Sequence, residues 1–324
     1  MQKLTRNLFK GEVSQIMKQE IFLKKNIKSA KSLSQIYSDK DYISRTDKIM
    51  AQYDIENATI PIIKYNKDEK FIWATVYNNY LKILENHACE EVQDAFDRIS
   101  KSVKLSENEI PQLKTISSQI QMHQGWKVRP VPGLISDQDY LEGLSNRVYC
   151  STQIIRRTDD LLFSPYPDYI HDLLGHIIPI GSKKIAQNLQ KLGTLSLNAS
   201  PDQIQQIASI YWKIFEMGFI KTKNNEYKAL GGAVLSSYQE LQNISSSNVK
   251  IEHLRNLQIG KKQVNDELLQ NEYFYIDRIE DIDEVIENLR KSWENESNKT
   301  DYFMILNSKQ INAPYQFTFF NKNY

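Results

Sequence analysis

Apolar side chains recur three and four residues apart in three stretches of the chain, a spacing that places them on one face of an α-helix. The stripes are formed by Val13, Ile16, Met17 and Ile21, then by Trp73, Val76, Tyr77, Tyr80, Leu81 and Leu84, and finally by Ile282, Val285, Ile286, Leu289 and Trp293. We expect all three faces to pack into a hydrophobic core. The pattern therefore predicts a mainly α-helical protein.

Two regions interrupt the helical pattern. Short aromatic and β-branched runs flank a polar turn within residues 302–319, which is typical of a small β-hairpin. Prolines punctuate the stretch from Arg129 to Pro179, and each fixes a backbone angle and removes a hydrogen-bond donor. Because functional side chains often lie on irregular backbone held by a rigid scaffold, we expect the site in this central stretch.

Composition narrows the class of protein. The 324 residues are 40% hydrophobic and 25% charged with a net charge of +1, so no strong field favours nucleic acid or an anionic membrane as a partner. Two cysteines make no disulfide framework. The first residues do not resemble a signal peptide, and no apolar run reaches the roughly 18 residues that span a bilayer. We expect a soluble, cytoplasmic protein.

The domain organisation is only weakly marked. Residues 25–60 are polar and rich in lysine, and a boundary near Pro61 is the best that the composition offers. We therefore expect residues 1–60 to form a helical N-terminal extension that packs on the core. Residues 61–324 would then form the main domain.

A pair of histidines lies in the central stretch, His171-Asp-Leu-Leu-Gly-His176. Imidazole is the commonest metal ligand among side chains, but residues five apart on an ideal α-helix point about 140° away from each other. The pair converges only if the helix is distorted or ends, which Gly175 and Pro179 permit. By itself this spacing is a weak signal, and two unrelated packing or surface histidines explain it as well.

A third ligand is needed for a metal centre, and Glu216 is the candidate. Ser200 followed by Pro201 predicts a helix start, and the helix that follows has an apolar face with Trp212 and Glu216 on its edge. A carboxylate there is costly unless it is paired or bound to a metal. On the pattern alone, a solvated or salt-bridged flank explains Glu216 equally. Two histidines with one carboxylate are the ligand set of non-haem iron(II) oxygenases.

The motifs around these residues carry a family resemblance. In chain order they are Arg129-Pro-Val-Pro-Gly-Leu-Ile-Ser136, Cys150-Ser-Thr-Gln-Ile-Ile-Arg156, Ser164-Pro-Tyr-Pro-Asp168, His171-Asp-Leu-Leu-Gly-His176, Ile210-Tyr-Trp212, Glu216-Met-Gly218 and Leu235-Ser-Ser-Tyr-Gln-Glu-Leu241. The set resembles the catalytic domain of the pterin-dependent aromatic amino acid hydroxylases. The resemblance implies that residues 61–324 form that family's basket of helices with a few short strands.

The resemblance also implies a role for each matching residue. His171, His176 and Glu216 would bind iron(II), and a tetrahydropterin and O₂ would be the other cofactors. The pterin would lie against Gly133, Leu134, Ile135, Ser136, Tyr140, Asp172 and Tyr211. The amino acid substrate would lie against Arg156, Ser164, Asp168, Trp212 and Ser236. Arg156, oriented by Asp168, would clamp the substrate carboxylate through its planar fork.

The sequence departs from the family at four positions. Cys150 replaces a histidine or glutamine, Phe163 replaces a tyrosine or histidine, and Tyr166 replaces a glutamate. Asp172 replaces a glutamate and is one methylene shorter. These departures affect the geometry expected around the pterin and the selectivity for the ring, and they leave the metal ligands and the arginine unchanged.

The resemblance implies ring hydroxylation of a free aromatic amino acid, and Trp212 favours a single-ring substrate because an indole in the wall leaves less room for another. We expect L-phenylalanine to become L-tyrosine. L-Tyrosine 3-hydroxylation, which Asp266 favours, L-tryptophan 5-hydroxylation and L-phenylalanine 3-hydroxylation are the alternatives. A zinc hydrolase or an inactive relative acting as a binding module are rivals of another class. The regulatory domain and assembly helix of animal members are not recognised in the chain, so we expect a monomer or weak oligomer.

Overall fold

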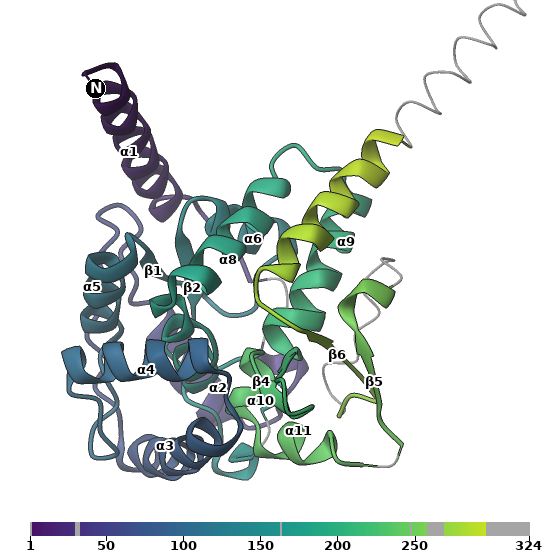
Figure 1. The fold of residues 1–324 in the computed structure, drawn as a ribbon. Helices are drawn as coiled ribbons and strands as arrows, with labels where there is room; N and C mark the ends of the chain where they lie inside the picture. The colour runs from purple at the N-terminus through teal and green to yellow at the C-terminus, as the bar shows by residue number, and fades with distance from the viewer. Residues whose placement is uncertain (1, 30–32, 163, 247, 258–268, 296–324) are drawn as a thin grey trace, which may run out of the picture.

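The computed structural model describes the backbone of residues 2–29, 33–162, 164–246, 248–257 and 269–295, and the side chains of these residues from Gly11 onward. The hairpin predicted within 302–319, Phe163 and Asp266 lie outside the described residues. The chain forms a mainly helical body with short strands (Figure 1), so the predicted fold class is confirmed. Among the described helices, none is long and apolar enough to cross a membrane.

The helices of the first half build one side of the body. In chain order they are α1 (Gln2–Leu23), α2 (Lys40–Met50), α3 (Lys67–His87), α4 (Glu90–Val103), α5 (Leu113–Gln124) and α6 (Asp137–Ser145). Their ends follow local chemistry. Asn66 and Glu69 form a reciprocal capping box at the start of α3, and Gly125 ends α5 in the left-handed conformation that glycine adopts without strain.

The helices of the second half surround the central stretch. They are α7 (Tyr169–His171), the π-helix η3 (Asp172–Ile177), α8 (Lys183–Leu195), α9 (Pro201–Tyr211), the π-helix η5 (Trp212–Glu216), α10 (Gly232–Ser236), α11 (Tyr238–Asn243) and a helix over residues 281–295. The predicted helix start at Ser200 is confirmed, since Ser200 and Gln203 form a capping box and Pro201 is the first helical residue.

Short strands make two small sheets. Strands β1 (Lys127–Pro130) and β2 (Val148–Ser151) pair in parallel, with Arg129 opposite Cys150. The second sheet has the order β4-β3-β6-β5, formed by β3 (Phe219–Lys221), β4 (Tyr227–Ala229), β5 (Lys250–His253) and β6 (Glu272–Ile276). This sheet lies beside α10 and α11 (Figure 1).

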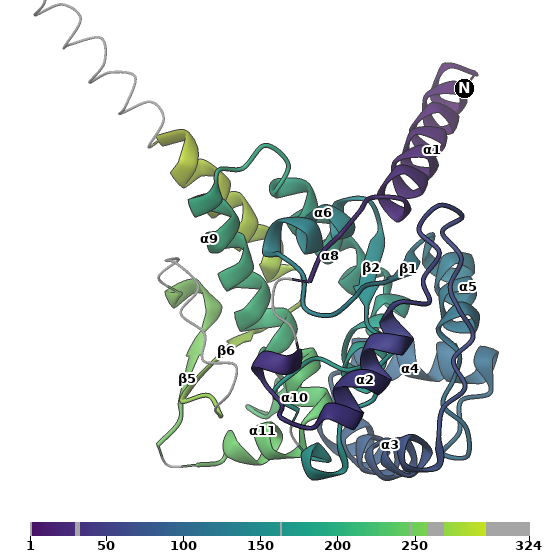
Figure 2. The ribbon, with the colours of Figure 1, turned by 180° about the vertical axis from the view of Figure 1, so that it is seen from behind.

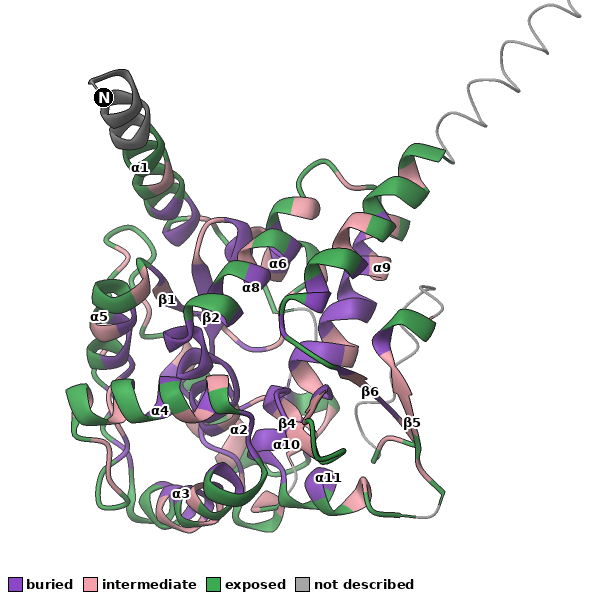
Figure 3. Ribbon diagram, in the orientation of Figure 1, coloured by how far each residue is buried: buried purple, intermediate pink, exposed green. Residues whose placement is uncertain are grey.

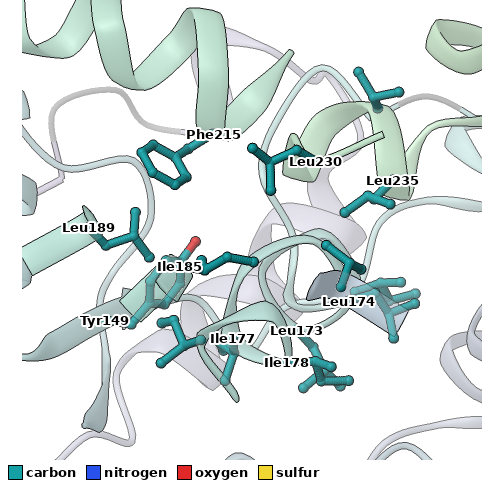
Figure 4. Close-up of a cluster of buried hydrophobic side chains, with 14 of the residues drawn as sticks. Tyr149, Leu173, Leu174, Ile177, Ile178, Ile185, Leu189, Phe215, Leu230 and Leu235 are labelled. Carbon is teal, nitrogen blue, oxygen red and sulfur yellow. The ribbon is translucent and has the colours of Figure 1, made fainter. Parts of the chain in front are cut away.

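The core surrounds η3, where every residue from Asp172 to Ile177 is buried. Leu173, Leu174 and Ile177 point into a cluster that also contains Phe215 and Leu235 (Figure 4). The segment α10 packs directly on η3, because Gly175 and Gly232 let the two backbones touch. A Cβ atom on Gly175 would lie 2.6 Å from the carbonyl oxygen of Gly232.

Two of the three predicted apolar stripes lie in the core, on α3 and on the helix over residues 281–295. The prediction for the first stripe is wrong. Val13, Ile16, Met17 and Ile21 are 55–70% exposed. Helix α1 projects from the body, and its exposed residues extend almost to its base (Figure 3). Periodicity shows that apolar side chains share a face, and does not show that another element covers that face.

The N-terminal residues join the body from the last turn of α1 onward (Figure 2). The Gln19 side chain donates to the carbonyl oxygen of Gly125 at 2.7 Å, and Tyr42 on α2 donates to that of Ile155 at 3.0 Å. Arg45 of α2 pairs with the buried Glu69 of α3 at 2.9 Å. The described part of residues 1–60 therefore contacts the body, while the division at residue 60 stays a prediction.

Gly175→Ala should lower the free energy of unfolding by about 1–3 kcal/mol, because the added methyl group forces η3 and α10 apart. Gly11→Ala is the matched control, since nothing lies within 4 Å of a Cβ atom there and alanine is the better helix former. Urea denaturation of the two variants and the parent measures the difference. Equal stability of all three proteins would show that the contact at Gly175 is not tight.

Candidate metal centre and active site

The π-helix η3 brings the two central histidines together. An α-helical pitch would turn residues five apart away from each other, but the hydrogen bonds of a π-helix join residues five apart and widen the turn. Ile178 N–H accordingly donates to the carbonyl oxygen of Leu173. The Nε2 atoms of His171 and His176 lie 3.1 Å apart. The distortion that the spacing requires is therefore present.

Glu216 reaches the same point from a second π-helical turn. Helix α9 widens into η5 before it ends, and Met217 N–H donates to the carbonyl oxygen of Trp212. The Glu216 Oε2 atom lies 3.1 Å from His176 Nε2 and 3.6 Å from His171 Nε2. Its side chain is 14% exposed. Glu216 therefore belongs to the histidine cluster and is not a solvated flank.

The proton arrangement of both histidines suits a metal ion. Ser236 Oγ donates to the carbonyl oxygen of Gly232 and lies 2.8 Å from His171 Nδ1, so His171 Nδ1 carries the proton and donates to the serine. Burial lowers the pKa of His171 to about 4, which keeps the imidazole neutral. The Nε2 lone pair then faces His176 and Glu216. One ligand atom from each of the three residues lies within 4.8 Å of the others.

A second group of metal-type residues, His253, Asp277 and Asp281, lacks this property. His253 Nδ1 accepts the backbone N–H of Arg255 at 3.0 Å, which leaves the proton of a neutral imidazole on Nε2. That Nε2 lies 3.4 Å from the Asp277 carboxylate. His253 is therefore arranged as a donor to a carboxylate and does not fit a metal ion.

Arg156 and Asp168 form a buried, two-pronged ion pair beside the histidines. Arg156 Nη2 lies 2.8 Å from Asp168 Oδ1 and Arg156 Nε lies 3.1 Å from Oδ2, and both side chains are 1% exposed. Burial acts to raise the pKa of Asp168, but the Arg156 charge outweighs it and the net shift is downward. Asp168 also accepts the backbone N–H of His171 at 2.9 Å. One carboxylate thus orients the arginine and begins the helix that carries a metal ligand.

These groups open into one cavity of about 240 Å³. The predicted site residues that line it are Gly133, Leu134, Ile135, Tyr140, Arg156, Ser164, His171, Asp172, Tyr211, Trp212, Glu216 and Ser236. Three predicted residues do not line it. Asp168 and His176 lie behind Arg156 and His171, and the exposed Ser136 caps α6 by accepting the N–H of Asp139.

Comparison with known proteins identifies the family. The family model described as biopterin-dependent aromatic amino acid hydroxylase matches residues 14–307. The chain belongs to this family. The chloroplastic phenylalanine 4-monooxygenase of Pinus taeda is 33% identical over 258 residues, which are 79% of this chain and 72% of that protein.

Animal relatives and solved structures agree with this assignment. Tyrosine 3-monooxygenase of Schistosoma mansoni is 34% identical over 78% of this chain and 54% of its own length, and human phenylalanine-4-hydroxylase is 38% identical over 59% and 42%. The chain thus spans about half the length of these animal proteins. The Chromobacterium violaceum phenylalanine hydroxylase with bound iron(III) and 7,8-dihydrobiopterin superimposes with a TM-score of 0.69 at 25% identity, over 80% of this chain and 94% of that one.

The hydroxylase therefore has the predicted cofactors, iron and a pterin. Its donor set, two neutral imidazoles and one carboxylate, is that of non-haem iron(II) oxygenases. When bound, iron(II) and the reduced pterin together supply the activation of dioxygen.

Asp172 of the hydroxylase is enclosed by donors. Its Oδ2 atom accepts the Ser151 hydroxyl at 2.9 Å and the Thr152 N–H at 3.0 Å, and its Oδ1 accepts the Tyr149 hydroxyl at 3.2 Å. Burial raises the pKa of Asp172 to about 7, against His176, which lowers it. Because three protein donors hold it, the carboxylate is fixed toward β2 at the edge of the cavity.

Sequence reasoning missed two tyrosines. Tyr166 is 3% exposed, and its hydroxyl oxygen accepts the N–H of Leu134 at 2.5 Å, which ties down the loop at Gly133. Tyr149 is 2% exposed and holds Asp172. No spacing identifies them, because each contact joins segments more than twenty residues apart. The departure at Tyr166 from the family pattern is the one signal that could have drawn attention to it.

His171→Ala should weaken Fe(II) binding by at least about 100-fold, since even outer partners of ligands are worth roughly 10–100-fold. His253→Ala is the control, because His253 is arranged as a donor. Iron bound after dialysis, measured by inductively coupled plasma mass spectrometry, reports the result. Full iron occupancy in His171→Ala, or equal loss in both variants, would contradict the assigned ligands.

Proposed function

We propose that this chain is an iron(II)- and tetrahydropterin-dependent monooxygenase that hydroxylates the ring of a free aromatic amino acid, with L-phenylalanine as its preferred substrate. The observation that carries the proposal is the placement of a three-ligand metal centre and a buried arginine on one cavity. His171, His176 and Glu216 hold the iron. Cytoplasmic location and a monomeric or weakly associating chain stay predictions from the sequence.

Arg156 binds the substrate carboxylate. Asp168 occupies its Nε and one proton of Nη2, and Nη1 makes only a 3.4 Å contact with the carbonyl oxygen of Leu161. The guanidinium group therefore keeps donors for a second carboxylate while its plane is fixed by the first. Because both partners of the pair are buried, the arginine is oriented before the substrate arrives.

The pterin lies on the opposite side of the cavity. The backbone from Gly133 to Ser136 offers hydrogen-bonding groups to its edge, and the ring of Tyr140 offers a stacking surface. The pterin loop is held from below by Tyr166 and from the N-terminal side by Ser29, whose hydroxyl donates to the carbonyl oxygen of Leu134 at 3.2 Å. The protein thus positions the two organic molecules on either side of the metal and excludes bulk water.

Trp212 favours a single-ring substrate. It lines the cavity at the start of η5, four residues before Glu216. An indole in the wall leaves less volume for an indole substrate. Hydroxylation of L-tyrosine is the second candidate, because the tyrosine 3-monooxygenases match the chain as closely as the phenylalanine hydroxylases do. L-Tryptophan 5-hydroxylation and L-phenylalanine 3-hydroxylation stay alternatives.

Incubation of the Fe(II)-loaded protein with tetrahydrobiopterin, O₂ and an equimolar mixture of the three aromatic amino acids tests the proposal. We expect L-tyrosine from L-phenylalanine as the main product, identified by mass and retention time. Preference for tryptophan would show that Trp212 does not limit the pocket. Turnover with zinc in place of iron, or with ascorbate or 2-oxoglutarate in place of the pterin, would contradict the proposed chemistry, as would the absence of any product.

Arg156→Lys should raise the KM for the amino acid by at least about 10-fold, or about 1.4 kcal/mol, because lysine keeps the charge and loses the planar fork. Arg157→Lys is the control, since the neighbouring Arg157 pairs with the exposed Asp159 at 2.7 Å. Steady-state kinetics at saturating pterin measure the change, and thermal unfolding checks that both variants are folded. An unchanged KM in Arg156→Lys would place the substrate carboxylate elsewhere.

A further inference from the structure

Three tyrosine hydroxyls lie between a metal ligand and the buried carboxylate of Asp172. The Tyr211 hydroxyl lies 3.3 Å from His176 Nδ1 and is hydrogen-bonded to the Tyr140 hydroxyl. The Tyr140 hydroxyl is in turn a hydrogen-bonding partner of Tyr149. Tyr149 donates to Asp172 Oδ1 at 3.2 Å. The hydroxyls therefore form a continuous series from the imidazole to the carboxylate.

The proton donors in this series all point the same way. With His176 Nε2 directed at the metal site, its Nδ1 carries the proton and donates to Tyr211. Tyr211 then has one proton to donate, to Tyr140, and the series continues through Tyr149. It ends on Asp172 Oδ1, while Asp172 Oδ2 is already occupied by Ser151 and Thr152. Each donor thus has an acceptor, and the last acceptor is an anion.

The same tyrosines fix the imidazole plane by packing. The Tyr149 ring stacks on the His176 ring with centroids 5.6 Å apart and an interplanar angle of 25°. The Tyr211 ring lies at 6.1 Å and 26°. The Tyr140 ring stands edge-on to both, at 5.8 Å from Tyr149 and 5.1 Å from Tyr211. His176 is therefore held both by these rings and at its Nδ1 atom.

We propose that Tyr211, Tyr140 and Tyr149 act as a tyrosine relay that joins His176 to Asp172, fixes the tautomer and orientation of His176, and thereby sets the metal affinity. A ligand histidine usually donates its second N–H directly to a carboxylate or carbonyl, which raises the basicity of the ligand. Here three phenols transmit the effect, because hydrogen bonds in a series polarise one another in a low-dielectric interior. The three tyrosines are positioning residues, and their assignment rests on the proposed metal site.

Tyr140→Phe and Tyr149→Phe each interrupt the relay and keep the ring. Tyr169→Phe is the matched control. Tyr169 is fully buried two residues before His171, and its hydroxyl donates to the carbonyl oxygen of Pro111 at 2.9 Å, away from the cavity. The metal-free full chain of each variant is titrated with Co(II) against a competing chelator, and thermal unfolding of the metal-free proteins checks folding. Co(II) affinity is a readout independent of turnover.

We expect each relay variant to bind Co(II) about 10-fold more weakly than the parent, and Tyr169→Phe to bind as the parent does. The double variant Tyr140→Phe/Tyr149→Phe should lose no more than either single variant, because both changes interrupt one series. Parent-like affinity in both relay variants would overturn the relay, as would equal weakening in Tyr169→Phe or multiplied losses in the double variant. Failure of the parent itself to bind Co(II) would overturn the proposed metal site together with the relay.

Discussion

The widened helical turns are the constraint on which the site depends. His171 and His176 meet because η3 follows a π-helical path, and Glu216 joins them because η5 does the same at the end of α9. A π-helical turn is less favourable than a regular α-turn and persists only where its surroundings hold it. The contact of Gly175 with Gly232 and the apolar cluster around η3 provide that support (Figure 4). Removing the support affects the metal ligands before it affects the rest of the fold.

The buried Arg156–Asp168 pair extends this dependence to the substrate. A buried ion pair is a weak source of stability, because desolvation offsets most of its Coulomb energy. Its value here is positional. Asp168 fixes the guanidinium plane with both carboxylate oxygens and also accepts the N–H of His171, so the distance between the substrate clamp and the metal is set by one residue.

Much of the site could be predicted from the sequence, because its residues lie in dense local motifs. Two of the apolar stripes, the helix start at Ser200 and the convergence of His171 with His176 and Glu216 followed from short-range patterns. The contacts of Tyr149 and Tyr166 could not be predicted, since they depend on how β2 and the loop at Gly133 pack on segments distant in the chain. The stripe on α1 failed for a related reason, because periodicity contains no information about what lies opposite a helix face.

Helix α1 has a consequence for the dynamics of the chain. Only its last turn, at Gln19, Phe22 and Leu23, is buried against the body, and the exposed residues from Gly11 to Lys18 make few contacts that could oppose fraying. An isolated helix of this length is marginal in water. Its backbone amides should therefore exchange with deuterium through local opening, at a far smaller free energy than those of η3, which open only with the core. Exchange rates along α1 report where the cooperative unit of the fold begins.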